Sequence, residues 1–259
     1  MSENHHPKSV LQCEPETLSI LYRDDYFLAV HKPAGLLVHK SPIDKHETRY
    51  AMNVIRDQIG QWVYPVHRLD KPTSGLLLFA LSSQNAKLLN ALFTNQDIHK
   101  TYTALVRGFV MGDRQVDHPM KEIAAFKNKQ YVADKKEAQI AITNIKPLTY
   151  FELPLSDGRF STSRYTLLEM KPRTGRKHQL RRHAKHISHP IIGDVKYGKG
   201  EHNRLFREQF GCPRLLLAAN KVEFAHPITE EKIMIHCPLE ANFSQLLDEL
   251  EPYARAISY

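Results

Sequence analysis

The sequence predicts an α+β protein with a mixed, largely antiparallel central sheet flanked by helices and loops. Short apolar or β-branched segments of strand length outnumber the segments whose apolar residues recur at helical spacing. Strand-like and helix-like segments do not alternate in the regular βαβ order that builds a parallel sheet. The chain has 259 residues, of which 42% are hydrophobic, so it can bury a sizeable core.

The first half of the chain combines strands with two helices. Apolar residues at helical spacing predict a helix over residues 48–59, ending before a glycine. The apolar run GLLLFAL at residues 75–81 predicts a strand in the middle of the sheet. A serine can cap the next helix, predicted over residues 82–94. Strands or extended segments are further predicted at residues 18–22, 26–30, 36–39 and 101–108.

The second half is richer in strands and begins with a polar stretch. Residues 112–138 show no clear periodicity, which predicts a mobile excursion. A short basic helix is predicted over residues 179–186 and an acidic amphipathic helix over residues 243–250. Strands are predicted at residues 138–145, 165–170, 215–217, 221–224 and 232–236.

The polar residues 1–16 predict a flexible N-terminal tail, and residues 17–259 are expected to form a single domain. Two subdomains that share one sheet are the alternative. No uncharged apolar run reaches about 18 residues and no signal peptide precedes the domain, so we expect a cytoplasmic protein without a membrane partner. Cys13, Cys212 and Cys237 lie far apart in the chain, so neither a disulfide framework nor a cysteine zinc site is expected.

Positive charge is concentrated in one segment of the chain. The formal net charge is +8, and residues 163–207 alone hold twelve Lys or Arg against three acids. The remaining residues therefore have a net charge of −1. A basic excess confined to one segment predicts a face that binds a polyanion, and a solvated basic surface is the simpler alternative.

The run HRLDKPTSG, residues 67–75, places one carboxylate, Asp70, between the cations Arg68 and Lys71. Neighbouring cations favour the ionised carboxylate, which then serves as a nucleophile, as a base or as half of a structural ion pair. Neither a phosphate-binding GxxxxGK[ST] loop nor a GxGxxG fingerprint is present. Three histidines, at positions 183, 186 and 189, recur every three residues, but Pro190 ends any helix there and no carboxylate lies at ligand spacing, so no metal site is expected.

Several motifs in the same order resemble those of the RluA family of RNA pseudouridine synthases, over almost all of residues 17–240. They are KPAG at 32–35, HRLDKPTSG at 67–75, KTYTALVRG at 100–108, TGRKHQLRRH at 174–183 and HPIIGD at 189–194. The resemblance implies the pseudouridine synthase fold. It also implies a reaction in which the C1′–N1 bond of a uridine breaks, the uracil turns, and C5 is joined to C1′.

Within the family, the runs RKHQLRRH (176–183) and DQIGQ (57–61) look most like the members that modify uridine 65 of tRNA. The expected partner is therefore tRNA. No metal or organic cofactor and no protein partner are expected, and the protein is expected to be a monomer.

The resemblance also implies roles for individual residues. Asp70 is the catalytic carboxylate, which either attacks C1′ or removes the 2′ proton, and Arg181 is its cationic partner. Tyr102 is expected to stack on the extruded uracil, a contact that contributes roughly 1–3 kcal/mol. Leu180 is expected in the wall of the base pocket. The residues expected to contact RNA are Arg68, Lys100, Arg176, Lys177, Arg182 and His183, whereas His67 is expected to be scaffold.

Other functions remain open at this stage. A synthase of the same family acting on ribosomal RNA shares all these motifs. A catalytically silent RNA-binding protein or RNA chaperone could keep the fold, although binding alone does not require Asp70, Tyr102 and Arg181 together. A general RNA hydrolase is disfavoured, because glycoside hydrolysis ordinarily uses two carboxylates and no second one is evident beside Asp70 in its motif.

Overall fold

The computed structural model describes residues 17–40, 47–122, 126–127, 130–131, 137–156 and 158–256. The predicted N-terminal tail lies outside this part of the chain. Eleven of the described strands form one sheet, namely β1 (Ile20–Arg23), β2 (Phe27–Lys32), β3 (Tyr64–Pro65), β4 (Ser74–Ala80), β5 (His99–Arg107), β6 (Arg114–Asp117), β9 (Ile142–Leu153), β10 (Ser163–Pro172), β11 (Leu217–Ala225), β12 (Lys232–His236) and β13 (Ala254–Arg255).

Two further short strands, β7 (Phe126–Lys127) and β8 (Gln130–Tyr131), form a separate hairpin. The described helices are α1 (Ala51–Ile59), α2 (Ser83–Asn95), α3 (Gln179–His186), α4 (Gly200–Phe210) and α5 (Ala241–Leu250), followed by a single 3₁₀ turn, Glu251–Tyr253. No described helix is long and apolar enough to cross a bilayer.

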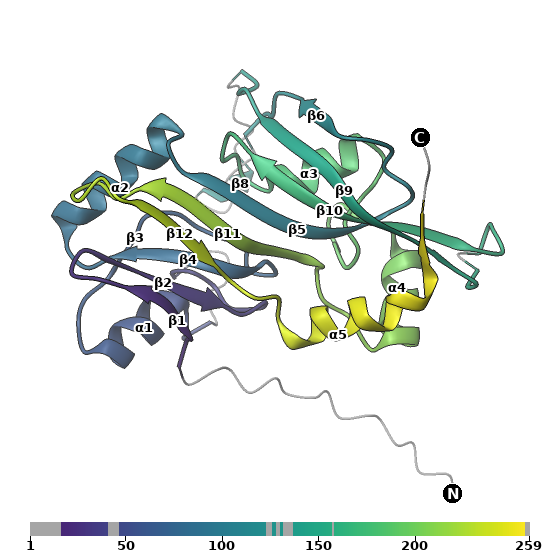
Figure 1. Ribbon diagram of the computed structural model, residues 1–259, viewed down its shortest axis with the longest axis horizontal. Helices are drawn as coiled ribbons and strands as arrows, with labels where there is room; N and C mark the ends of the chain where they lie inside the picture. The colour runs from purple at the N-terminus through teal and green to yellow at the C-terminus, as the bar shows by residue number, and fades with distance from the viewer. Residues whose placement is uncertain are drawn as a thin grey trace, which may run out of the picture.

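The main path through the sheet is β1-β2-β4-β11-β5-β10-β9-β13. Figure 1 shows β1, β2 and β4 towards one end of the molecule and β9 and β10 towards the other. The pairs in this sheet are antiparallel, with the exception of β4 and β11, which run parallel. The mixed, largely antiparallel α+β fold predicted from the sequence is thus confirmed.

Helices cover both faces of the sheet, because successive side chains of a strand point to opposite faces. Leu77 and Phe79 of β4 belong to a hydrophobic cluster with Ile55 of α1. Leu78, between them, belongs to a different cluster with Leu89 of α2. The apolar run predicted to be a central strand is therefore buried on both faces, as a continuous apolar sequence requires.

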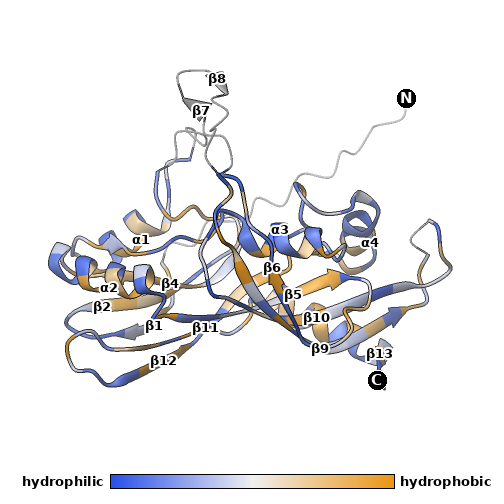
Figure 2. Cartoon of the chain, turned by 90° about the horizontal axis from the view of Figure 1, so that it is seen from above, coloured by the Kyte–Doolittle hydropathy of each residue, from blue (hydrophilic) through white to orange (hydrophobic). Residues whose placement is uncertain are grey.

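The other half of the sheet is covered in the same way. Leu180 of α3 packs with Met170 of β10, whereas Phe206 of α4 packs with Tyr165 of the same strand, in a separate cluster. Figure 2 shows α3 and α4 coloured mostly as hydrophilic, and both helices bury polar side chains, such as Arg181 and His202, beside their few apolar ones.

The parallel pair β4 and β11 meets at Gly75, where the two backbones approach closely. Gly75 has φ +113°, and a Cβ atom built on it would lie 2.1 Å from the carbonyl oxygen of Ala219. Only glycine fits such an approach. This contact fixes the start of β4, and therefore also fixes the turn that carries Asp70 just before it.

The structure corrects several predicted boundaries of strands. Strand β9 runs for 12 residues, well beyond the predicted 138–145, and it pairs with β10, β6 and β13. The predicted strands 215–217 and 221–224 are parts of the single strand β11. Residues 36–39 form no strand, and only Leu37 makes an isolated bridge to Tyr50.

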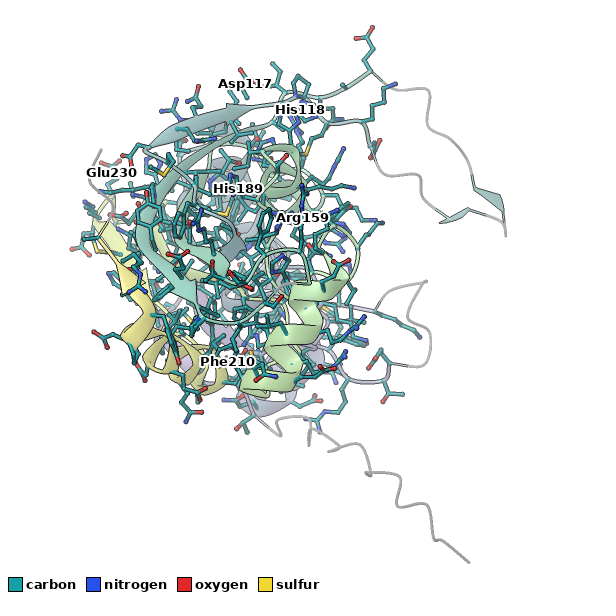
Figure 3. All side chains as sticks on the ribbon, turned by 90° about the vertical axis from the view of Figure 1, so that its right-hand side faces the viewer. Asp117, His118, Arg159, His189, Phe210 and Glu230 are labelled. Carbon is teal, nitrogen blue, oxygen red and sulfur yellow. The ribbon has the colours of Figure 1, made fainter. Side chains whose placement is uncertain are left out.

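Two further features of the fold were not predicted. Helix α4 was not predicted, because its charged sequence hides the apolar residues that face the core. The stretch 112–138, predicted to be a mobile excursion, contains β6 and the strand pair β7 and β8, whereas residues 123–125, 128–129 and 132–136 lie outside the described part of the chain. Asp117 and His118, labelled in Figure 3, mark the point where β6 ends. Strand β6 has the sequence RQVD, in which only Val116 is buried, so it lacks the alternation of apolar and polar residues by which strands are usually predicted.

Candidate active site

A cavity of about 690 Å³ brings together most of the residues singled out in the sequence. Its wall is formed by the turn that carries Asp70, the C-terminal part of α2, the beginning of β5, and the segment that leads from β10 into α3. Segments more than 100 residues apart in the sequence therefore meet around one space. Asp70, Arg181, Tyr102 and Leu180 all contribute to its lining.

The turn at Asp70 is held by backbone contacts. The amide of Thr73 donates to the carbonyl oxygen of Asp70 at 3.0 Å, which closes the turn just before β4. Behind it lies Lys32, which is fully buried and whose Nζ donates to the carbonyl oxygens of Pro33, Leu36 and Lys71 at 2.7, 2.8 and 3.2 Å. Burial lowers the pKa of Lys32 to about 7. Lys32 thus ties the KPAG segment to the turn.

Arg181 is the cation that reaches Asp70. Its Nη1 donates to Asp70 Oδ2 at 3.1 Å, although the two residues lie 111 positions apart. Its Nε and Nη2 donate to the two carboxylate oxygens of Asp194, at 2.7 and 2.9 Å. Such a two-pronged contact fixes the plane of the guanidinium, so Asp194 orients the remaining nitrogen towards Asp70.

Opposing effects set the charges of this pair. Burial alone would lower the pKa of Arg181, but its hydrogen bonds to Asp194 and Asp70 raise the pKa above the ordinary arginine value. Burial alone would raise the pKa of Asp194, and the hydrogen bonds from Arg181 and from two backbone amides lower it below the ordinary aspartate value. Both groups are therefore charged across the physiological range.

The cations next to Asp70 in the sequence do not fill this role. Nζ of Lys71 lies 2.6 Å from a carboxylate oxygen of Glu47 and forms an ion pair with it. Arg68 is exposed at the edge of the cavity, with Asp70 on the same stretch of wall. Arg68 is therefore available to contact a nucleotide that enters the cavity.

Tyr102 lies on β5 and lines the cavity. Burial, together with the charge of Asp70, raises the pKa of the Tyr102 phenol, so the ring is neutral. Leu180, only 6% exposed, supplies an apolar part of the wall. An aromatic ring, a leucine and a carboxylate thus line one cavity, which suits a flat nucleobase attached to a sugar.

Lys100 and His67 form part of the support on the α2 side. Nζ of Lys100 lies 5.7 Å from the centre of the Phe93 ring, and the His67 ring stacks on the same ring at 4.9 Å. Nε2 of His67 accepts a hydrogen bond from the amide of Leu78 at 2.9 Å, and burial lowers the pKa of His67 to about 3. A neutral imidazole that accepts from a strand amide is scaffold, as predicted for His67.

The basic residues around α3 divide into two groups. Arg176 and Lys177 are exposed and line the cavity, and Arg176 Nε donates to the carbonyl oxygen of Ile140. Arg182 lies outside the cavity lining and donates to the carbonyl oxygen of Lys121 at 3.1 Å.

His183 does not lie where it was predicted to act. Its side chain is 0% exposed, and its ring nitrogens contact the hydroxyl of Thr143 at 2.8 Å and the carbonyl oxygen of His118 at 3.3 Å. A histidine enclosed in this way cannot touch a phosphate group. The predicted contact between His183 and RNA is therefore wrong, and the residue instead joins α3 to β9 and to the segment after β6.

Sequence reasoning gave no role to four further residues near the cavity, namely His178, Gln179, Asp194 and Tyr197. The buried Gln179 accepts hydrogen bonds from the Thr174 hydroxyl and the Arg176 amide, and donates to the carbonyl oxygen of Ile142 and the hydroxyl of Thr143. It therefore fixes the entry into α3. Three of the four stand in the motifs TGRKHQLRRH and HPIIGD, which was the available signal.

Among the described residues, no three His, Cys, Asp or Glu side chains are grouped so as to hold a metal ion. The cavity instead holds the carboxylate of Asp70 against the fixed guanidinium of Arg181, beside the ring of Tyr102 and a basic rim. This arrangement fits a reaction on one nucleotide of a nucleic acid.

Comparison with known proteins gives the same class. Residues 26–186 match the RNA pseudouridylate synthase family, and the chain belongs to this family. It is an RNA pseudouridine synthase, an isomerase. It is 50% identical over 235 residues to the tRNA pseudouridine synthase C of Vibrio vulnificus, covering 90% of this chain and 96% of the relative. The synthase of the same name from Pasteurella multocida is 47% identical over 232 residues, covering 90% and 96%.

A solved structure shows the same fold at lower sequence identity. Human RNA pseudouridylate synthase domain containing 4 superposes with a TM-score of 0.67 at 24% identity, covering 93% of this chain and 95% of the human chain.

Proposed function

We propose that this enzyme converts a uridine of tRNA, at position 65, to pseudouridine, with Asp70 as the catalytic carboxylate. The observation that carries the proposal is the cavity in which Asp70 faces Arg181 and Tyr102, in a chain about half identical to enzymes named tRNA pseudouridine synthase C. The basic residues of the segment 163–207 supply a face for the tRNA backbone. The enzyme acts in the cytoplasm as a monomer and without a cofactor.

The geometry supports a division of labour between the two oxygens of Asp70. Oδ2 accepts a hydrogen bond from Arg181, whereas Oδ1 accepts none within the described part of the chain. Oδ1 is therefore the oxygen that acts on the ribose. It either forms a bond to C1′ as the C1′–N1 bond breaks, or removes the 2′ proton. On the first route, the new bond from C5 of the turned uracil to C1′ replaces the ester bond between Asp70 and C1′. On the second route, the C1′–N1 bond breaks as the 2′ proton leaves, and that proton returns to C2′ when C5 bonds to C1′. On both routes C5 then loses its own proton.

The target nucleotide has to leave its helix to reach Asp70, which costs a few kcal/mol. Stacking of the uracil on Tyr102 recovers roughly 1–3 kcal/mol of this. Arg68, exposed at the rim, occupies the space that the base leaves in the RNA. Leu180, which is buried in the wall, and the bound uracil keep water away from C1′, which favours isomerisation over hydrolysis.

The test is the conversion of unmodified tRNA transcripts, with pseudouridine mapped at single-nucleotide resolution. We expect one modified position, 65, and none in a transcript with cytidine there. Asp70→Asn should lower the rate by at least about 10⁴-fold, because both chemical routes need a carboxylate. Activity that survives in Asp70→Asn would refute the role of Asp70.

Mapping total RNA from a deletion strain separates the remaining alternatives. A pseudouridine lost from ribosomal RNA, with tRNA unchanged, would assign the enzyme to ribosomal RNA. If RNA bound normally and no uridine were isomerised in any RNA, the protein would be a silent RNA-binding protein.

A further inference from the structure

We propose that Nε2 of His178 binds the ribose 2′-hydroxyl of the target uridine, and that this contact makes the site selective for RNA over DNA at that nucleotide. The proposal rests on the proposed function in one respect, the approach of the target ribose to Asp70. Nothing in the sequence motifs assigned a role to His178. Its position, its fixed ring and its strained backbone carry the argument.

His178 lines the cavity beside the reactive oxygen of Asp70. Its Nε2 lies 3.7 Å from Asp70 Oδ1, too far for a hydrogen bond but close enough for one small group to contact both atoms. For attack on C1′, that carbon has to come within about 3–3.5 Å of Oδ1, and for removal of the 2′ proton the neighbouring C2′ has to come equally close. The 2′-oxygen is two bonds from C1′, and it therefore enters the region between Oδ1 and Nε2.

Tyr197 fixes the ring of His178. The Tyr197 hydroxyl lies 2.9 Å from His178 Nδ1, and the Tyr197 ring packs against the guanidinium of Arg181 at 5.2 Å. The backbone amide of Tyr197 donates to a carboxylate oxygen of Asp194 at 2.9 Å. The carboxylate that orients Arg181 thus also places the tyrosine that orients His178.

These contacts assign the protonation of the imidazole. Burial raises the pKa of the Tyr197 phenol, so it remains a hydroxyl, which can either donate to Nδ1 or accept from it. The carboxylate of Asp70 lies 3.7 Å from Nε2, and its negative charge favours the ring proton at Nε2, so the hydroxyl donates to Nδ1. Burial, with Arg181 and two nearby lysines, lowers the pKa of His178 to about 4, although Asp70 opposes this shift. The neutral ring then carries its single proton on Nε2. An N–H at this position donates to the 2′-oxygen.

The backbone of His178 is evidence that the side chain matters. His178 precedes α3 with φ 56° and ψ 28°, a left-handed conformation that a residue with a Cβ adopts at a cost of order 1–3 kcal/mol. Glycine would adopt it freely. This conformation holds the His178 ring at the cavity, with Nε2 3.7 Å from Asp70 Oδ1, where a contact with substrate can repay the cost.

The experiment measures binding, so that turnover does not enter. Full-length tRNA transcripts carry uridine, 2′-deoxyuridine or cytidine at the target position, and dissociation constants are measured with the Asp70→Asn enzyme. With His178 present, we expect 2′-deoxyuridine to weaken binding about tenfold, the value of one good hydrogen bond. In His178→Gly, which keeps the backbone conformation, uridine and 2′-deoxyuridine should bind equally.

Two further variants guard against a merely structural effect. His178→Gln retains an N–H donor and should restore part of the discrimination, whereas Tyr197→Phe frees the ring and should reduce it. Undiminished discrimination against 2′-deoxyuridine in a folded His178→Gly enzyme would overturn the proposal. If uridine and cytidine transcripts bound the Asp70→Asn enzyme equally, the assignment of the target would fail and the proposal with it.

Discussion

The two halves of the candidate active site are held in different ways. The turn that carries Asp70 is fixed by backbone atoms, through the close approach at Gly75 and the three carbonyl oxygens that surround Lys32. The opposite wall is fixed by charged and polar side chains, with Asp194 bound to Arg181. We call the Asp70 turn the backbone half and the wall with Arg181 the side-chain half. Substitutions that add bulk should destabilise the backbone half most, whereas substitutions that remove a charge should affect the side-chain half most.

Gly75→Ala gives the largest expected effect and tests the backbone half. A Cβ at this position meets the backbone of Ala219 at 2.1 Å, so β4 and β11 cannot keep their pairing. We expect a loss of more than about 4 kcal/mol in the free energy of unfolding, measured by urea titration.

Gly35→Ala is the matched control, because Gly35 also has a positive φ, +89°, but open space around its Cβ position. Its cost should be only about 1–2 kcal/mol, from backbone strain alone. Equal losses in the two variants would show that conformation, and not the close approach, makes Gly75 necessary.

Asp194→Ala tests the side-chain half. Arg181 would remain buried with Asp70 as its partner, and removal of one member of a buried ion pair costs about 3–5 kcal/mol. Loss of the two-pronged contact also frees the guanidinium, and kcat should fall about 100-fold, as small misplacements near reacting atoms do. Both quantities are measured on the purified variant, with single-turnover kinetics for kcat.

The control is Glu208→Ala, which breaks the exposed pair with Arg207 and should cost no more than about 1 kcal/mol. An Asp194→Ala enzyme with normal kcat would mean that Arg181 needs no second carboxylate to reach Asp70.

Local features of the site could be predicted from the sequence, whereas contacts between distant segments could not. Asp70, Arg181 and Tyr102, singled out from motifs, line one cavity, although their catalytic roles stay predictions. Helix α3 has the predicted bounds, because apolar spacing and flanking residues are local signals for a helix. The 3.1 Å contact between Asp70 and Arg181 is a property of the sheet order, which places β4 and α3 around one cavity. A single sequence contains no local signal for such a contact.

The misses have physical causes as well. Strand β9 contains Pro147 and Lys146, which interrupt an alternating pattern, and its pairing with β10 and with the edge strands overrides that local preference. His183 was placed on the RNA surface because its neighbours are basic, but its own ring faces β9. A helix alternates buried and exposed positions over a few residues, so charge in the sequence does not establish exposure.

Lys32 is a fully buried cation in the backbone half, and it makes stability depend on pH. Burial lowers its pKa from 10.5 to about 7 in the folded protein. Between these values the unfolded chain binds more protons than the folded one, so stability should rise with pH from about 7 to about 10.5. We expect Tm to rise less in Lys32→Met than in the unsubstituted enzyme over pH 7.5 to 9.5. Parallel curves would mean that Lys32 keeps its ordinary pKa.

The smallest expected effect concerns the rim between the two halves, where Lys177 is exposed beside the cavity. When a lysine binds a phosphate group, about one counterion leaves the RNA. Lys177→Gln should therefore weaken tRNA binding by less than about tenfold. It should also reduce the slope of the logarithm of the tRNA binding constant against the logarithm of the salt concentration by about one. Lys232→Gln, on β12 with 73% of its side chain exposed, should change neither quantity. Filter binding at several salt concentrations measures both. An unchanged slope in Lys177→Gln would place the tRNA backbone elsewhere, and Arg68 and Arg176 would then be the next cations to substitute, since both line the same cavity.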